Sequence, residues 1–149
     1  MKTIKLENKD ISPAILFLKS LSMIGQPTRG KQKFVERLVE KNKEYLEQEK
    51  EVIKRYAKTD EEGNLELSED GRFDWKDEIT DQEKYSLSEE REELSAEIAE
   101  ISFVEYSNKY EALFEVLDNW QEPITPEYSY IYDKLMDQYE ANEETKEEK

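Results

Sequence analysis

The sequence predicts a helix-dominated α+β fold, with a long central helix, a packed C-terminal helical hairpin and a small β-hairpin or sheet. Three observations predict this fold: one long helical repeat of apolar residues, two shorter helical repeats close together near the C-terminus, and short stretches in which apolar and polar residues alternate. We expect a single domain over residues 1–139, followed by a charged flexible tail at 140–149.

The composition excludes several kinds of chemistry. The chain has no cysteine and no histidine, so disulfides, thiolate or imidazole catalysis, Ser-His-Asp triads and the usual zinc sites are ruled out. The sequence has no run of about 18 apolar residues, which a membrane-spanning helix would need, and the N-terminus does not resemble a signal peptide. We therefore expect a cytoplasmic protein that is not an enzyme and needs no cofactor.

The charge is divided unevenly along the chain. The net charge is −16, yet residues 1–58 have 14 Lys or Arg against 8 Asp or Glu, whereas residues 59–149 have 8 against 30. An acidic surface of this size repels nucleic acid and attracts basic protein surfaces. The expected partner is therefore a protein with a basic surface, with no membrane contact and with nucleic acid disfavoured, while the oligomeric state stays open.

The N-terminal segment predicts a strand and then a short buried helix. Residues 3–7 alternate apolar and polar side chains, and residues 8–10 suit a turn. Ser12 is a good N-cap for a helix with Pro13 at its first position, and Gly25 suits the end of that helix. The expected apolar residues of this helix are Ile15, Leu16, Leu18 and the stretch 21–23.

Residues 28–58 predict the central helix. At 1.5 Å per residue this helix would extend about 46 Å, long enough for later segments to pack along it. Its two apolar rows are Phe34, Leu38, Tyr45, Val52 and Tyr56, and Val35, Val39, Leu46 and Ile53.

The middle of the chain predicts a β-hairpin and a polar helix. Residues 63–75 alternate apolar and polar side chains on either side of a turn at 69–71, which is typical of two short paired strands. Residues 76–95 are densely charged and predict a solvent-exposed helix with a break near 86–88. Residues 96–102 fit either a helix or a strand that pairs with residues 3–7, and we prefer the strand.

The C-terminal third predicts a helical hairpin. Residues 105–120 place aromatic and aliphatic side chains on one face, which should pack on the central helix. After a short connection, Thr125 and Pro126 again form a cap followed by proline, and an amphipathic helix continues to residue 139.

Two motifs superficially resemble ligand loops but lack the required residues. Gly30-Lys31 is followed by glutamine, where a phosphate loop has serine or threonine. Residues 60–64 lack the alternating oxygen ligands and the closing glutamate of a calcium loop. The carboxylates of the polar helix have no pocket-forming motif beside them, so we expect neither a catalytic nor a metal site.

Two surfaces are candidates for contact with a partner. The first is acidic and rich in aromatic residues. These aromatic residues fit either of two roles, as anchors of an interface or as side chains packed in the core. The residues of this surface are Glu89, Glu93, Glu97, Glu100, Glu111, Glu115, Asp118, Trp120, Glu122, Glu127 and Tyr130. The second is a basic stripe that fits an anion, formed by Lys33, Arg37 and Lys41. The alternative is that these basic residues form ion pairs with the glutamates interleaved among them on the same helix.

The order of several blocks resembles a known family. These blocks are KLENKDISPAILFL, RGKQKFVERLVEKNKEYLEQEKEVIKRYAKTDEEGN, DGRFDWKD and YEALFEVLDNW followed by YIYDKLMDQYE. Over residues 2–139 the chain resembles small uncharacterised proteins encoded by phages and prophages of Gram-positive bacteria. The resemblance implies a phage setting and the cytoplasm of the host cell, and it supplies no catalytic residues.

These observations favour a non-enzymatic phage protein that binds and modulates a host protein, such as a defence or nucleic-acid-processing factor. The acidic, tyrosine-rich surface would compete for a basic groove that otherwise binds nucleic acid. The alternative is an accessory or chaperone protein of virion head or tail assembly. The sequence does not separate these two functions or identify the partner.

Overall fold

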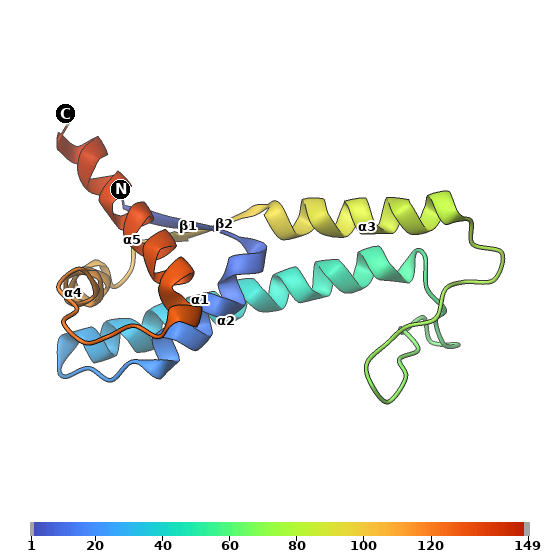
Figure 1. Cartoon of the computed structure of the whole chain (residues 1–149), viewed down its shortest axis with the longest axis horizontal. Coiled ribbons are helices and arrows are strands. Elements are labelled where there is room, and N and C mark those ends of the chain that lie inside the picture. The colour runs from blue at the N-terminus through green and yellow to red at the C-terminus, as the bar shows by residue number, and fades with distance from the viewer. Residues whose placement is uncertain (1, 148–149) are drawn as a thin grey trace. The chain divides into compact units, whose positions relative to one another are not determined.

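The computed structural model describes residues 2–147, with side chains up to residue 142. It has two compact units, one formed by residues 1–42 and 98–149 and the other by residues 43–97. The elements, labelled in Figure 1, are β1 (Thr3–Glu7), α1 (Asn8–Ser20), α2 (Gln26–Lys54), α3 (Asp81–Ala96), β2 (Ile98–Ser102), α4 (Ser107–Asp118) and α5 (Pro126–Glu147). The helix-dominated α+β class is confirmed, while a single domain over 1–139 stays a prediction.

The first unit contains a two-stranded antiparallel sheet. Strand β1 pairs with β2 in a register that places Thr3 opposite Ser102 and Glu7 opposite Ile98. Ile4 and Leu6 of β1 and Ile101 of β2 are buried, so one face of the sheet belongs to the core. The preference for a strand at 96–102 that pairs with 3–7 is therefore confirmed.

Helix α1 begins earlier than predicted. Asn8–Lys9–Asp10 forms its first turn rather than a separate turn, and Pro13 lies inside the helix, so Ser12 is not the N-cap. The predicted buried face is also displaced, because Phe17 is fully buried and Leu16 is 56% exposed. The helix ends at Ser20, so residues 21–23 lie outside it. Strand β1 leads directly into this helix. The stabilisation from burying the apolar side of α1 outweighs the loss of the hydrogen bond that Pro13 cannot donate.

Helix α2 confirms the predicted central helix, although it ends at Lys54 rather than near residue 58. Its N-terminal part packs closely on α4: an alanine Cβ at Gly30 would lie 2.1 Å from the backbone oxygen of Lys109. The ring of Phe34 meets Tyr110 and Phe114 edge-on, with centroids 5.6 and 5.4 Å apart. Glycine at position 30 thus allows close approach of two helices, which the sequence did not predict.

The two C-terminal helices occupy different places in the core. Helix α4 packs on α2 as predicted, whereas α5 packs mainly on β1 and α1 and more lightly on α4. Phe17 of α1 contacts the rings of Tyr128 and Tyr132 from α5. The predicted packing of the whole hairpin on the central helix is therefore correct for one helix only.

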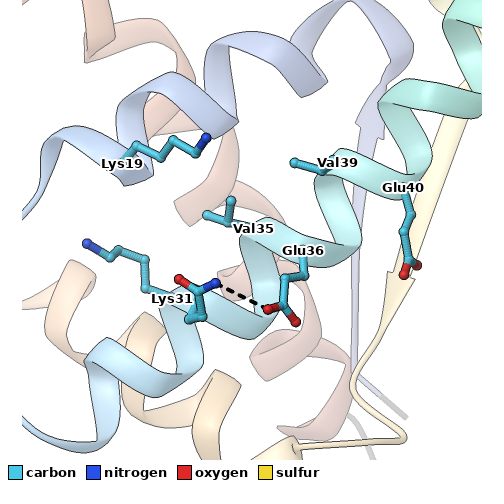
Figure 2. A pocket seen from close by; sticks show the side chains of 7 residues that line it. Lys19, Lys31, Val35, Glu36, Val39 and Glu40 are labelled. Carbon is cyan, nitrogen blue, oxygen red and sulfur yellow. Dashed lines mark hydrogen bonds between the residues drawn. The ribbon is translucent and has the colours of Figure 1, made fainter.

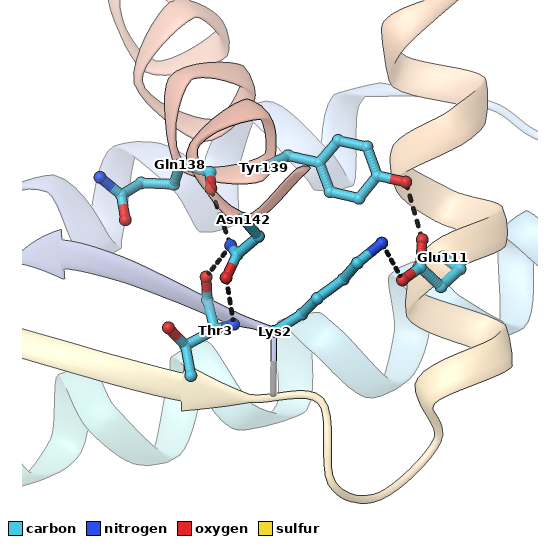
Figure 3. A network of polar contacts seen from close by, with 6 residues as sticks. All are labelled: Lys2, Thr3, Glu111, Gln138, Tyr139 and Asn142. Carbon is cyan, nitrogen blue, oxygen red and sulfur yellow. Dashed lines mark hydrogen bonds and ion pairs between the residues drawn. The ribbon is translucent and has the colours of Figure 1, made fainter. Parts of the chain in front are cut away.

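Helix α5 covers the outer edge of β1 with side-chain amides (Figure 3). The Thr3 N–H donates to Asn142 Oδ1 at 3.1 Å, and Asn142 Nδ2 donates to the Thr3 carbonyl at 2.6 Å. One turn earlier, Gln138 Oε1 accepts from the Lys5 N–H at 3.1 Å. Past the predicted boundary at residue 140, α5 continues to Glu147, and Asn142 bonds to the backbone of β1.

The second unit is built from the end of α2, two tight turns and α3. Isolated antiparallel bridges join Ala57 to Trp75, Thr59 to Leu65 and Leu67 to Phe73, which confirms pairing across the predicted 69–71 turn. Ile53, Ala57 and Leu87 form its small buried core, with partly buried Phe73 and Trp75 against it.

Helix α3 is continuous from Asp81 to Ala96, so the predicted break near 86–88 is absent. A capping box begins it: the Glu83 N–H donates to Thr80 Oγ1 at 3.1 Å, and the Thr80 N–H donates to the Glu83 carboxylate at 3.3 Å. Buried Leu87 lies where the break was expected, and its burial favours an unbroken helix.

None of the helices in the described part of the chain has both the length and the apolar character needed to cross a membrane.

Candidate functional site

A hollow of about 440 Å³ lies in the first unit, between the α1–α2 connection and the C-terminal end of α4. It is lined by both apolar and polar side chains. The lining residues are Ser22, Met23, Ile24, Pro27, Val116, Asn119, Trp120, Gln121 and Glu122. A mixture of apolar and polar side chains is also found in protein interfaces.

The α1–α2 connection holds one wall in place. The Leu21 carbonyl accepts a hydrogen bond from Lys31 Nζ at 2.6 Å, and the Thr28 N–H donates to the Gly25 carbonyl at 3.0 Å. Gly25 adopts a φ of +75°, which favours glycine and turns the chain into α2. Between these fixed points Ile24 is 93% exposed, so an aliphatic side chain is presented to solvent by an anchored loop.

The end of α4 holds the other wall. Asn119 Nδ2 donates to the Glu115 carbonyl at 2.8 Å, and the Trp120 N–H donates to the Leu117 carbonyl at 3.3 Å, so the chain remains ordered just past the helix. The indole Nε1–H of Trp120 is buried but has no hydrogen-bond acceptor among the described residues. Leaving a buried donor unpaired costs about 1–3 kcal/mol, and because this nitrogen is buried, it is not accessible to an acceptor at the surface.

In the described part of the chain, one carboxylate lines this hollow, and two others are exposed on the last turn of α4. Glu122 lines it, and Glu115 and Asp118 are exposed on the same end of α4. Within the described residues, these three side chains form no ion pair. Trp120 and Glu122 thus line one hollow together with Ile24, a neighbour that the sequence did not reveal.

The other predicted acidic residues belong to both units. Glu89, Glu93 and Glu97 are exposed and belong to the second unit, whereas Glu100 lies on β2 in the first. Glu111 is already engaged, because its carboxylate pairs with Lys2 Nζ at 2.6 Å and accepts from the Tyr139 hydroxyl at 2.7 Å (Figure 3). Glu111 therefore has a structural role in the first unit.

Glu127 and Tyr130 lie on α5. Glu127 is exposed in the first turn, where a negative charge favours the helix dipole. Tyr130 is 55% exposed, and its hydroxyl is 3.4 Å from Asp10 Oδ2. Lys134 Nζ lies 5.6 Å from the Tyr130 ring centroid, so this tyrosine is exposed but not without contacts.

Sequence reasoning omitted Tyr85 from the candidate surface. Tyr85 is exposed on α3 in the second unit, and a hydrogen bond with Glu89 raises the pKa of its hydroxyl above the ordinary value. The spacing of four residues between Tyr85 and Glu89 in a polar helix is the signal that could have revealed this pair.

The basic stripe is largely engaged within the first unit. Lys33 Nζ lies 4.0 Å from the ring centroid of Tyr106, and Arg37 pairs with Glu105 at 2.7 Å and with Glu40 at 3.3 Å. Burial raises the pKa of the nearby Tyr110 hydroxyl, although a hydrogen bond with Arg37 opposes this shift. Lys41 has no ion pair among the described residues and lines a groove beside β2.

Comparison with known proteins identifies the family. A family model described as a protein of unknown function, DUF1617, matches residues 2–148. The chain belongs to the DUF1617 family. No curated protein and no solved structure matches it. The expectation of an uncharacterised family is confirmed at this level.

This DUF1617 chain has a further hollow of about 500 Å³ between α1 and α2. Figure 2 shows Lys19 of α1 and Lys31 of α2 around Val35 and Val39. Gln32 Nε2 donates to the Glu36 carboxylate at 3.2 Å across one helical turn. Two lysines and two glutamates line this hollow, so its charges balance, whereas Glu122 is the one charged residue, among those the structure describes, that lines the hollow at Trp120.

The described residues contain no group of three acidic side chains arranged to hold a metal ion. What the Trp120 hollow offers is contact area and nearby negative charge. These are the elements of binding a macromolecule, since aromatic anchors in desolvated centres supply most interface energy.

Proposed function

We propose that this protein acts by binding and modulating another protein, without catalysing a reaction itself. In the specific form of the proposal, the chain is encoded by a phage or prophage, works in the host cytoplasm, and inhibits a defence or nucleic-acid-processing factor. The observation that supports binding most directly is the apolar hollow at Trp120, where Ile24 is 93% exposed.

Charge supports a basic partner. The net charge is −16, and Asp118 and Glu122 are exposed close to the apolar centre. Such carboxylates steer a basic surface toward the hollow and accelerate association, while the apolar centre limits dissociation. A basic groove that normally binds nucleic acid would be covered in this way, which explains inhibition by competition.

The hollow itself predicts which part of the interface is energetically important. An apolar or aromatic side chain of the partner would pack against Ile24 and Trp120. Carboxylates farther from this centre would affect mainly the association rate and the salt dependence.

A salt-gradient pull-down tests this proposal. The tagged protein is incubated with lysate of phage-infected host cells, and bound proteins are eluted with increasing salt and identified by mass spectrometry. We expect a basic protein that is released at moderate salt and is lost when Ile24→Asp is used as bait. Leu67→Asp is the matched control, because Leu67 is also exposed and belongs to the other unit.

Charge reversal tests the electrostatic part separately. Glu122→Lys should weaken capture of the same protein and reduce its salt dependence, whereas Glu61→Lys in an exposed turn should not. Capture that is insensitive to salt and to Glu122→Lys would contradict the competition mechanism. Recovery of virion components that resist high salt would favour the head or tail assembly function instead.

A further inference from the structure

The two strands of the small sheet differ in whether the backbone groups at their outer edges have hydrogen-bond partners. Strand β1 pairs with β2 on one side, and on the other side its backbone is bonded by Asn142 and Gln138 of α5. The groups bonded to α5 belong to Thr3 and Lys5, so the odd-numbered residues of β1 direct their backbone polar groups away from β2.

This register fixes the orientation of β2. Ile4 and Leu6 exchange hydrogen bonds with Ile101 and Ala99, because Thr3 and Lys5 are bonded elsewhere. The Phe103 N–H donates to the Lys2 carbonyl at 3.0 Å, in agreement with this alternation. The backbone groups of Ile98, Glu100 and Ser102 therefore lie at the outer edge of β2. In the described part of the chain, those of Ile98 and Glu100 have no hydrogen-bond partner, and no third strand is present.

A groove of about 310 Å³ runs beside this edge in the first unit. Helix α2 provides one wall through Arg37 and Lys41, and β2 with the following loop provides the other; the remaining lining residues are Glu100, Ile101, Ser102, Val104, Glu105 and Tyr110. Ile98 and Val104 are exposed at the two ends of the edge. An open edge beside a groove with apolar ends can accept an extended peptide.

A second copy of the chain is a poor occupant. If two β2 strands paired across a two-fold axis centred on Glu100, the two Glu100 carboxylates would lie directly opposite each other. Like charges opposite each other destabilise a strand pair, and the net charge of −16 on each copy adds repulsion. The edge is therefore better suited to a different protein.

The charges of the groove indicate the chemistry of that protein. Side chains of an added strand point alternately to the two faces of the sheet, and one set would face the groove that Ile101, Arg37 and Lys41 line. Lys41 and Glu100 both line the groove and form no ion pair within the described residues. Alternation along β2 directs Glu100 to the face opposite Ile101, so Lys41 is the unpaired charge on the face of Ile101. We propose that the outer edge of β2 binds an extended segment of another protein as an added strand, with an acidic side chain facing Lys41. This surface is separate from the Trp120 hollow, so the inference goes beyond the proposed function.

A displayed library of short random peptides, selected on the whole chain, tests the proposal. Enriched peptides should share an acidic residue at one position. Lys41→Glu should change the selected residue at that position to lysine or arginine, because only the sign of the facing charge has changed. Lys43→Glu, the same substitution at an exposed site of α2, should leave the selection unchanged.

Synthetic copies of an enriched peptide then test the hydrogen bonds. N-methylation of the alternate amides that face β2 should weaken binding about tenfold or more, whereas N-methylation of the others should have little effect. If no peptide is enriched, or if neither N-methylation nor Lys41→Glu changes the binding, the proposal is wrong. Peptides lost with Ile24→Asp would bind the Trp120 hollow, which overturns the edge proposal and leaves the proposed function intact.

Discussion

Replacing Gly30 with alanine should destabilise the first unit, although alanine is the better helix former. A Cβ at position 30 would lie 2.1 Å from the Lys109 carbonyl oxygen, 2.8 Å from the Lys109 carbonyl carbon and 3.2 Å from the Leu113 Cβ. A tolerable carbon–oxygen contact is about 3.3 Å, so α4 would have to retreat by about 1 Å. Flexible side-chain movement cannot relieve this contact, because two of the three atoms belong to the backbone.

The size of the effect follows from two opposing terms. Overpacking of this kind costs about 1–3 kcal/mol, and a displacement of about 1 Å also weakens contacts between Phe34 and the rings of α4. Alanine recovers about 1 kcal/mol through its helix propensity. With the overpacking cost at the upper end of its range, the net loss is about 2 kcal/mol, which for a chain of 149 residues lowers Tm by about 4–8 °C.

Urea and thermal unfolding followed by circular dichroism would measure this loss. Gln48→Ala, at an exposed position of the same helix, serves as the control and should change stability by no more than about 0.5 kcal/mol. If Gly30→Ala is neutral, or stabilises by the propensity gain alone, α4 does not approach α2 at Gly30 and this packing is wrong.

Three further predictions concern caps and titration. Asn142→Leu leaves the Thr3 N–H and C=O without their partners, so the free energy of unfolding should fall by about 2 kcal/mol and the Thr3 amide should exchange faster with solvent. Thr80→Ala removes the capping box of α3 and should cost about 1 kcal/mol in urea unfolding. Burial raises the folded-state pKa of Tyr110, so its contribution to stability is present below the unfolded value of about 10 and is lost as pH rises above it; Tyr110→Phe should flatten this alkaline decline.

Matched variants separate these effects from general damage. Glu140→Leu and Ser88→Ala are exposed positions on the same helices and should leave stability nearly unchanged. Equal losses in Asn142→Leu and Glu140→Leu would contradict the edge-covering role of Asn142. An alkaline unfolding curve that is unaltered by Tyr110→Phe would contradict the assigned burial of that hydroxyl.

The elements that the sequence predicted well were those with a local signal. Strand β1 has the predicted limits, α2 follows the long helical repeat, and α5 begins at Pro126 after Thr125. In each case the apolar period and the capping residues favour the same structure, and tertiary packing agrees with them.

The start of α1 was mispredicted because two signals competed. Ser12 followed by Pro13 is a good helix start, but burial of Ile11, Ala14 and Phe17 places the beginning at Asn8. A proline in the second turn removes one hydrogen bond, and extensive apolar burial on the same helix compensates. Local motifs do not reveal such compensation.

The candidate site was predicted in part. Trp120 was expected as an anchor near carboxylates, but its neighbours Met23, Ile24 and Pro27 come from a connection roughly ninety residues away in the chain, and no local pattern links them. An exposed isoleucine directly before Gly25, in a connection between helices, was the available signal. The groove beside β2 depends on strand register and on the amides of α5, which only the folded structure brings together.

Site-specific photocrosslinking in cells that produce the protein tests the central claim, that the Trp120 hollow binds a protein. A photoreactive amino acid at Gln121, on the rim of the hollow, should yield one dominant protein adduct, and Ile24→Asp in the same chain should abolish it. The same group at exposed Glu66, in the second unit, should not yield that adduct. An adduct at Gln121 that persists with Ile24→Asp, or no adduct at Gln121 above the Glu66 control, would contradict the account.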